Sequence, residues 1–340
     1  MAHLLKFTER GIYCPAGDFY IDPWLPVTRA FITHAHSDHA RQGMGCYIST
    51  PITAALMKAR ISEDISVTAL NYGEKLTING VSVSLHPAGH IPGSAQIRIE
   101  KNGYVAVVSG DYKTEPDGLS IPIEPIRCHE FVSECTFGLP IFRWKPSEIS
   151  IQEITDWWMT NQSQNKNSVL IAYALGKAQR LLNDLAGDGR IVVHGSIYRM
   201  NEILKHAGLP IASCEKISEL NNRVKDKSLL VLAPPSAIGS TWIRRFSPFS
   251  LGIVSGWMAI RGIRRRRAAD AGFVISDHAD WDGLIQVIRC TGAEKVYLTH
   301  GYSDPFARYL PKIGIQAEPV QSQFYGEGED LEVREPKVDT

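Results

Sequence analysis

A short segment crowded with ionisable residues constrains this chain more than any other feature. His34, His36, Asp38 and His39 form an H-x-H-x-D-H cluster directly after the apolar run 30–32. Since alternate residues of an extended chain point to the same side, His34 and His36 can present their imidazoles to one metal ion. The chain then turns, so that Asp38 and His39 can face a second ion. Imidazole and carboxylate are ordinary zinc ligands, and the segment therefore predicts a metal centre at a strand end.

Three further polar residues stand where other predicted strands end. His90 follows the alternating run 81–85, Asp111 follows the apolar run 104–108, and His300 follows the run 295–298. An isolated histidine at a strand end is more often a hydrogen-bonded structural residue than a ligand. Together, however, these three residues complete two metal sites, and the two oxygens of Asp111 suit a bridge between the ions.

The chain changes character in its middle part. Up to about residue 145 short strands end in polar loops, and this pattern returns near the strand predicted at 272–275. Between them strands alternate with helices, which is typical of an α/β unit with a mostly parallel sheet. We therefore expect one domain over 1–145 and 269–325, an inserted domain over 146–268, and an acidic tail over 326–340. Ser150 and Glu153 match a capping box, which predicts that the first inserted helix begins there.

Composition narrows the functional classes only mildly. Lys plus Arg equals Asp plus Glu at 36 each, whereas nucleic-acid binders are often basic overall. The run 264–267 consists of four arginines, so a local cationic strip remains. No apolar run approaches the roughly 18 residues of a membrane span, and the first residues lack a secretory pattern. We expect a cytoplasmic protein with no membrane partner, whose six scattered cysteines are reduced thiols.

The arrangement of these residues resembles a known superfamily. Asp22, the H-x-H-x-D-H cluster, His90, Asp111 and His300 are similar to the successive motifs of the metallo-β-lactamase superfamily. Three further segments resemble its β-CASP nuclease branch, namely 133–136, 173–179 and 276–280. The similarity covers about residues 10 to 320 and is strongest to bacterial ligase-associated DNA exonucleases. It implies an α/β fold, with a metallo-β-lactamase αβ/βα sandwich and an inserted α/β β-CASP cap domain.

The resemblance also implies a role for each site residue. His34, His36 and His90 would hold one Zn²⁺, Asp38, His39 and His300 would hold the other, and Asp111 would bridge them. Asp22 would orient a ligand. Mn²⁺ is the alternative metal. Glu134 and His278 match the first two β-CASP motifs; the imidazole would protonate the leaving oxygen, and the carboxylate would keep it charged.

Substrate contacts are predicted from position alone. Lys177 opens a helix directly after a strand, and Ser196 lies at a similar strand end, so both could bind phosphate at helix-start amides. Tight turns without a ligand explain both segments equally well. Arg264 and Arg265 could grip the backbone of a single strand, although such a run is usually a solvated face.

The resemblance leads to a two-zinc phosphodiesterase as the function. The first hypothesis is a DNA exonuclease acting on single strands or ends in repair, with a 5′ start, alongside an ATP-dependent DNA ligase and a helicase. The alternative is an RNase J-like or 3′-processing ribonuclease, because a histidine such as His300 at the third β-CASP motif is commoner in RNA-acting members. A non-catalytic scaffold would have lost metal ligands, and this chain keeps all seven. Small-molecule hydrolases of the superfamily lack an inserted cap of this size.

Overall fold

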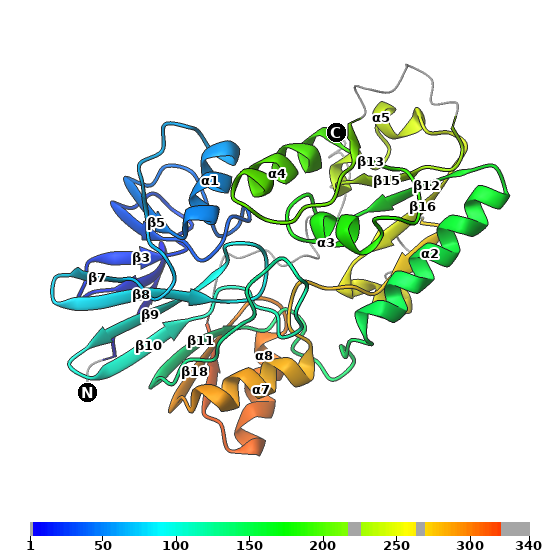
Figure 1. The fold of residues 1–340 in the computed structure, drawn as a ribbon. Helices are drawn as coiled ribbons and strands as arrows, with labels where there is room; N and C mark the ends of the chain where they lie inside the picture. The colour runs from blue at the N-terminus through cyan, green and yellow to red at the C-terminus, as the bar shows by residue number, and fades with distance from the viewer. Residues whose placement is uncertain (1–2, 217–225, 263–268, 321–340) are drawn as a thin grey trace, which may run out of the picture.

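The computed structural model describes residues 3–216, 226–262 and 269–320, which form three β-sheets with helices packed on them (Figure 1). Two of the sheets form a sandwich built from both ends of the chain, and the third is built from its middle. The arginine run 264–267 and the acidic tail 326–340 lie outside the described residues.

The first sheet has the order β1-β2-β3-β4-β5-β6. Its first three strands are antiparallel, and β3 to β6 are parallel. The strands are β1 Lys6–Thr8, β2 Gly11–Cys14, β3 Phe19–Ile21, β4 Arg29–Phe31, β5 Cys46–Ser49 and β6 Val67–Ala69.

The second sheet has the order β19-β18-β11-β10-β9-β8-β7. The strands β19, β18, β11 and β10 are parallel, while β9, β8 and β7 continue as antiparallel neighbours. Their bounds are β7 Lys75–Ile78, β8 Val81–Pro87, β9 Ala95–Lys101, β10 Tyr104–Val108, β11 Glu130–Glu134, β18 Lys295–Thr299 and β19 Ala317–Pro319.

Apolar side chains pack in three places in the sandwich: between the two sheets and beneath the helices on each outer face. Between the sheets, Ile12 and Phe31 of the first pack with Val83 and Ile97 of the second. Helix α1 (Pro51–Arg60) covers the outer face of the first sheet, and α7 (Trp281–Thr291) and α8 (Ser303–Tyr309) cover the outer face of the second. The result is the four-layer αβ/βα sandwich that the resemblance implies.

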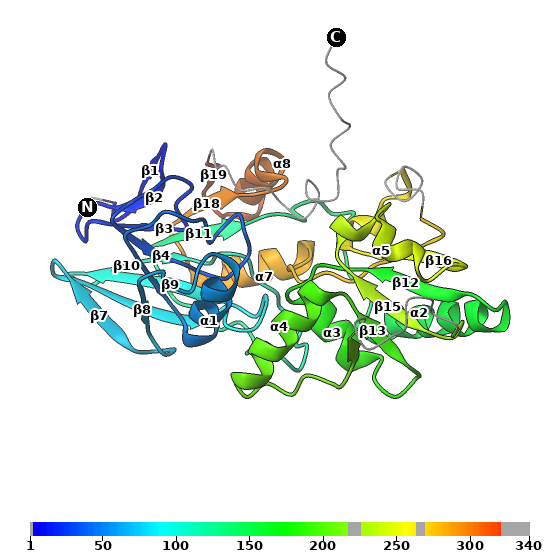
Figure 2. The same ribbon diagram turned by 90° about the horizontal axis from the view of Figure 1, so that it is seen from above.

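The third sheet is fully parallel and belongs to the middle of the chain. Its order is β14-β13-β15-β12-β16-β17, and helices α3 and α4 lie between it and the sandwich, with α4 beside α1 in both views (Figures 1 and 2). The strands are β12 Asn167–Ile171, β13 Ile191–Val193, β14 Glu215–Lys216, β15 Leu230–Ala233, β16 Phe249–Val254 and β17 Ala271–Phe273; the helices are α2 Ser147–Ser163, α3 Lys177–Asp184, α4 Gly195–His206 and α5 Thr241–Arg244. This confirms the α/β character predicted for the insertion.

One continuous apolar core joins the third sheet to the sandwich. Ile32 and Leu56 of the sandwich belong to the same buried cluster as Leu170, Leu181 and Leu204 of the inserted unit. The inserted unit is therefore packed onto the sandwich rather than tethered to it, and it rests beside the strand ends that carry the predicted ligands.

Two local predictions for the insertion are wrong. The strand near 272 pairs with β16 in the third sheet, so it belongs to the inserted unit and not to the outer domain. Helix α2 begins at Ser147 instead of at the Ser150 capping box. The Ser150 hydroxyl donates to the Val274 carbonyl, 2.8 Å away, because tertiary packing offers it an acceptor that the local sequence does not reveal.

Two chain-wide features complete the description. None of the helices in the described residues combines the length and the apolar content that crossing a bilayer requires. The six cysteines are all free thiols.

Candidate metal centre

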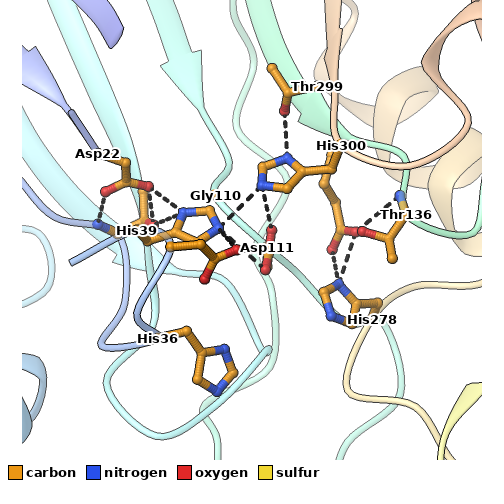
Figure 3. Close-up of polar contacts among 12 residues, drawn as sticks. Asp22, His36, His39, Gly110, Asp111, Thr136, His278, Thr299 and His300 are labelled. Atoms are coloured by element: carbon orange, nitrogen blue, oxygen red, sulfur yellow. Dashed lines mark hydrogen bonds and ion pairs between the residues drawn. The ribbon is translucent and has the colours of Figure 1, made fainter. Parts of the chain in front are cut away.

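Seven side chains from distant parts of the chain converge at one edge of the sandwich. Figure 3 shows four of them, His36, His39, Asp111 and His300. They lie in the loops that follow β4, β8, β10 and β18, strands whose carboxyl ends meet at this edge. The ligand atoms of one cluster, all within 4.8 Å of one another, belong to His34, His36, His90 and Asp111. Those of a second cluster, within the same limit, belong to Asp38, His39 and His300.

The carboxylate of Asp111 lies between the two clusters. Its Oδ2 is 3.6 Å from His34 Nε2 and 3.5 Å from His39 Nε2, and its Oδ1 is 3.7 Å from His300 Nε2. Oδ1 is buried and has no hydrogen-bond partner. A buried carboxylate oxygen without a donor is costly, so this atom calls for a cation.

The hydrogen bonds of His36 and His90 show which of their nitrogens carries a proton. His36 Nε2 lies 3.1 Å from the Leu175 carbonyl, and His90 Nδ1 lies 2.7 Å from the Asp277 carbonyl. Since a carbonyl only accepts, these outer nitrogens donate, and His36 Nδ1 and His90 Nε2 carry lone pairs. These two nitrogens are 3.1 Å apart and would repel each other.

A shared cation removes this repulsion. A tetrahedral ion with Zn–N bonds of roughly 2.0–2.1 Å separates neighbouring ligand nitrogens by about 3.3 Å. The nitrogen pairs His34–His36 and His36–His90 are both at 3.1 Å, and His39–His300 is at 3.2 Å. The spacing and the donor set of both clusters therefore fit zinc.

Burial keeps most of these imidazoles neutral. It lowers the pKa of His34, His36 and His90, and it lowers that of His300 to about 4. Neutral imidazole is the form that binds a metal. These four residues therefore need not lose a proton near pH 7.

His39 and Asp111 respond to each other's charge. Burial favours a low pKa for His39, but the carboxylates of Asp111, Asp38 and Asp22 outweigh it and raise the pKa well above its ordinary value. Burial likewise favours a high pKa for Asp111, but the nearby His39 and His300 lower it. Asp111 is therefore ionised, and a metal ion can replace the His39 proton as its counter-charge.

Asp22 belongs to neither cluster and holds the loop that carries His34 to His39. Its Oδ1 accepts from the Thr33 amide at 2.8 Å, and its Oδ2 accepts from the Thr33 hydroxyl and from His39 Nδ1, the latter at 2.7 Å. It orients His39 as the resemblance implies. The backbones of Asp22 and His300 have positive φ values of 43° and 63°, a conformation that surrounding structure must enforce.

A histidine and a carboxylate pair beside the clusters. His278, in the loop between β17 and α7, directs Nδ1 at both oxygens of Glu134, at the end of β11, each at 2.9 Å (Figure 3). Glu134 also accepts from the Tyr112 amide at 2.8 Å, and burial raises its pKa. The ring of His278 lies 4.7 Å from that of His90, so the pair adjoins the first cluster.

Sequence comparison finds relatives of this chain among named nucleases and a probable DNA ligase. No protein-family profile matches the chain. It is 29% identical over 97% of its length to a probable DNA ligase of Opitutus terrae, of which the match covers 32%. It is 28% identical to a ribonuclease of Thermus thermophilus, over 58% of this chain and 54% of that protein. Cleavage and polyadenylation specificity factor subunit 3 of Dictyostelium discoideum is 26% identical over 34% of this chain and 15% of that protein.

Three observations point to the same family. They are the named relatives, the sandwich with its inserted parallel sheet, and the convergence of the motif residues. The chain resembles nucleases of the β-CASP branch of the metallo-β-lactamase superfamily in its sequence and in the placement of its motif residues. A solved structure, a protein of unknown function from Enterococcus faecalis V583, shares the fold with a TM-score of 0.58 at 13% identity, over 87% of this chain and 79% of that one. The chain spans about a third of the probable DNA ligase and about half of the ribonuclease.

The predicted substrate-binding residues lie in different surroundings from the predicted metal ligands. Lys177 is fully buried, with Nζ 3.8 Å from an Asp277 carboxylate oxygen, so its amine faces the protein interior and the predicted phosphate seat is not supported. Ser196 is exposed in the first turn of α4, and its hydroxyl lies 2.8 Å from His194 Nδ1. Arg264 and Arg265 lie outside the described residues.

Sequence reasoning missed the partners that orient the imidazoles. The carbonyls of Leu175 and Asp277 and the hydroxyl of Thr33 contact predicted metal ligands. Every residue type has a main-chain carbonyl, so residue type does not reveal which carbonyl accepts a hydrogen bond. The only available signal was that Leu175 and Asp277 lie inside the motif segments 173–179 and 276–280.

Proposed function

We propose that this chain is a metal-dependent nuclease that hydrolyses phosphodiester bonds with two zinc ions, or with manganese in their place. One observation carries the proposal: the Asp111 carboxylate joins two histidine clusters, and the His278–Glu134 pair lies beside them. Two such ions, when bound, acidify a water and stabilise the charge that develops on a phosphate.

The residues of the chain divide the remaining work. His34, His36 and His90 would hold one ion, Asp38, His39 and His300 the other, and Asp111 would contact both. Glu134 holds Nδ1 of His278 and favours the charged imidazole, so Nε2 would donate a proton to the leaving oxygen. Such a donor suits phosphodiester hydrolysis, in which a poor alkoxide leaving group must be protonated.

A DNA substrate is favoured by the relative that covers most of this chain. The match spans 97% of the chain and about a third of a protein named as a probable DNA ligase. We therefore infer an exonuclease that acts on single strands or ends in DNA repair, with a 5′ start. An ATP-dependent DNA ligase, and a helicase of the same pathway, would be its partners.

A ribonuclease is the second candidate. Two of the relatives are named as a ribonuclease and as a cleavage and polyadenylation factor, although they match less of the chain. His300, at the third β-CASP motif, points in the same direction.

Labelled substrates distinguish these candidates. Single-stranded DNA and RNA of one sequence, each labelled at the 5′ or the 3′ end, are incubated with the zinc-loaded protein. We expect chelator-sensitive release of nucleotides from the DNA, starting at its 5′ end, and no release by the Asp111→Ala variant. Faster cleavage of the RNA would favour the second candidate. Activity that a chelator leaves untouched would overturn the proposal.

A further inference from the structure

The inserted unit reaches the first metal cluster through its main chain. Leu175, between β12 and α3, accepts from His36 at 3.1 Å, and Asp277, in the segment that leaves β17, accepts from His90 at 2.7 Å. The outer nitrogens of the second cluster have partners inside the sandwich: His39 meets Asp22, and His300 meets Thr299 at 2.9 Å. Within the described residues, the inserted unit therefore supplies the outer hydrogen-bond partners of two imidazoles of the first cluster.

A buried ion pair joins the two segments that carry these carbonyls. Lys177, two residues after Leu175, has Nζ 3.8 Å from Oδ2 of Asp277, and the two residues are 0% and 2% exposed. Lys177 Nζ also lies 5.2 Å from the centre of the Tyr173 ring. A lysine and an aspartate are rarely this buried unless they are paired. Removing either charge removes this buried pairing.

The backbone between Leu175 and Lys177 is pressed against the metal-binding loop. Gly176 has a φ of +94°, and a Cβ at this position would lie 2.4 Å from Cγ2 of Ile91, the residue after His90. One helical turn later, Arg180 Nη1 donates to the Ser276 carbonyl at 3.3 Å. The two carbonyls thus sit in a closely packed junction, and the position of each depends on the other.

We propose that Lys177 and Asp277 are positioning residues for the first metal site, through which docking of the inserted unit sets the affinity of that site alone. The inference rests on the proposed two-metal centre. The pair holds the Leu175 and Asp277 carbonyls where they accept from His36 and His90, which aims the inner nitrogen of each ring at the ion. Loss of such outer partners typically weakens metal binding roughly 10- to 100-fold.

The test measures zinc affinity at each site separately. His300→Ala leaves the first site intact and His36→Ala leaves the second, so competition with a chelator in these two backgrounds reports one site each. Lys177→Met should weaken the first site on the order of 10-fold and leave the second unchanged. Asp277→Asn keeps the shape of the side chain and the main-chain carbonyl, and it should weaken zinc binding at the first site to the same extent. It tests the proposal if Lys177→Met does not fold. The double variant should be no weaker than the single variants, because they remove one shared interaction.

Arg190→Met is the control within the inserted unit, because Arg190 pairs with Glu215 and Asp226 instead. Unchanged affinity of the first site in both Lys177→Met and Asp277→Asn would overturn the proposal. Equal weakening of both sites, or the same loss in Arg190→Met, would also overturn it, because general loosening would then be the cause. A wild-type protein that binds two zinc ions but cleaves no nucleic acid would contradict the proposed function only, and one that binds no zinc would contradict both.

Discussion

Nδ1 of His278 is equidistant from the two carboxylate oxygens of Glu134, at 2.9 Å from each. Both side chains are buried, and Glu134 is fixed further by the Tyr112 amide. The carboxylate therefore sets the tautomer of the ring and stabilises its charged form, in which Nε2 bears a proton. This pairing joins β11 of the sandwich to the segment that returns from the inserted unit.

Replacing Glu134 by glutamine should slow the chemical step without loss of metal. The amide keeps the shape of the side chain but removes the charge that stabilises the imidazolium, so we expect kcat to fall about 100-fold, the lower range for loss of a general acid. Turnover of labelled DNA and elemental analysis of the same sample check this. Loss of zinc from the variant would show that Glu134 supports the metal sites instead.

Replacing Asp111 by alanine should release metal from both clusters. Its carboxylate faces imidazoles of each, and no other carboxylate of the described residues is shared by both clusters. We expect less than one zinc per chain by elemental analysis and no detectable cleavage. The control variant Glu63→Ala, which changes an exposed acidic residue, should keep two zinc ions per chain. An Asp111→Ala protein with full metal content would exclude the bridging role.

Replacing Asp22 by asparagine should weaken the second metal site selectively. Asp22 accepts from His39 Nδ1 at 2.7 Å and also fixes Thr33, and the amide would remove the negative charge behind the ligand ring. We expect zinc affinity at that site to fall about 10-fold. Chelator competition in the His36→Ala background measures it. An effect confined to the first site would contradict the orienting role of Asp22.

The buried pair of Lys113 and Asp117 should make stability depend on acid pH. Burial favours a high pKa for Asp117, but the Lys113 ammonium and the amides of Ser120 and Leu119 outweigh it, and the net pKa lies below its ordinary value of 3.8. Because the folded state binds this proton less tightly than the unfolded state, the contribution is complete above the unfolded pKa. It is lost as pH falls through the folded one.

Lys113→Met tests this dependence in metal-stripped protein. At pH 7 the free energy of unfolding should fall by about 3 kcal/mol, as for other broken buried pairs. At pH 3 the difference from wild type should be clearly smaller, because this pH lies below the ordinary value of 3.8 and the unfolded state takes up the proton there. Denaturant unfolding at both pH values measures it; an equal difference at both would mean that the ion pair contributes no pH dependence.

The sequence alone was enough to predict which seven side chains come together as candidate metal ligands. The spacing of His34, His36, Asp38 and His39 is local, and strand periodicity placed His90, Asp111 and His300 at strand ends. His90, Asp111 and His300 follow strands of one sheet that run in the same direction, so these three could be expected at one edge, whereas their meeting with the His34 to His39 cluster depends on how the two sheets pack. The resemblance added Glu134 and His278, and the structure places them in contact. The ion bound there and the substrate stay predictions.

Only the tertiary structure decided what surrounds these groups. The Ser150 hydroxyl bonds Val274 instead of capping a helix, and Lys177, at a helix start that suggested a phosphate seat, is enclosed against Asp277. Each contact joins residues about a hundred or more positions apart. Local spacing fixes the periodicity and the direction of a side chain along its own element. Which carbonyl or charge it meets depends on how the inserted unit packs on the sandwich, and burial then determines whether a charged group serves a substrate or the protein itself.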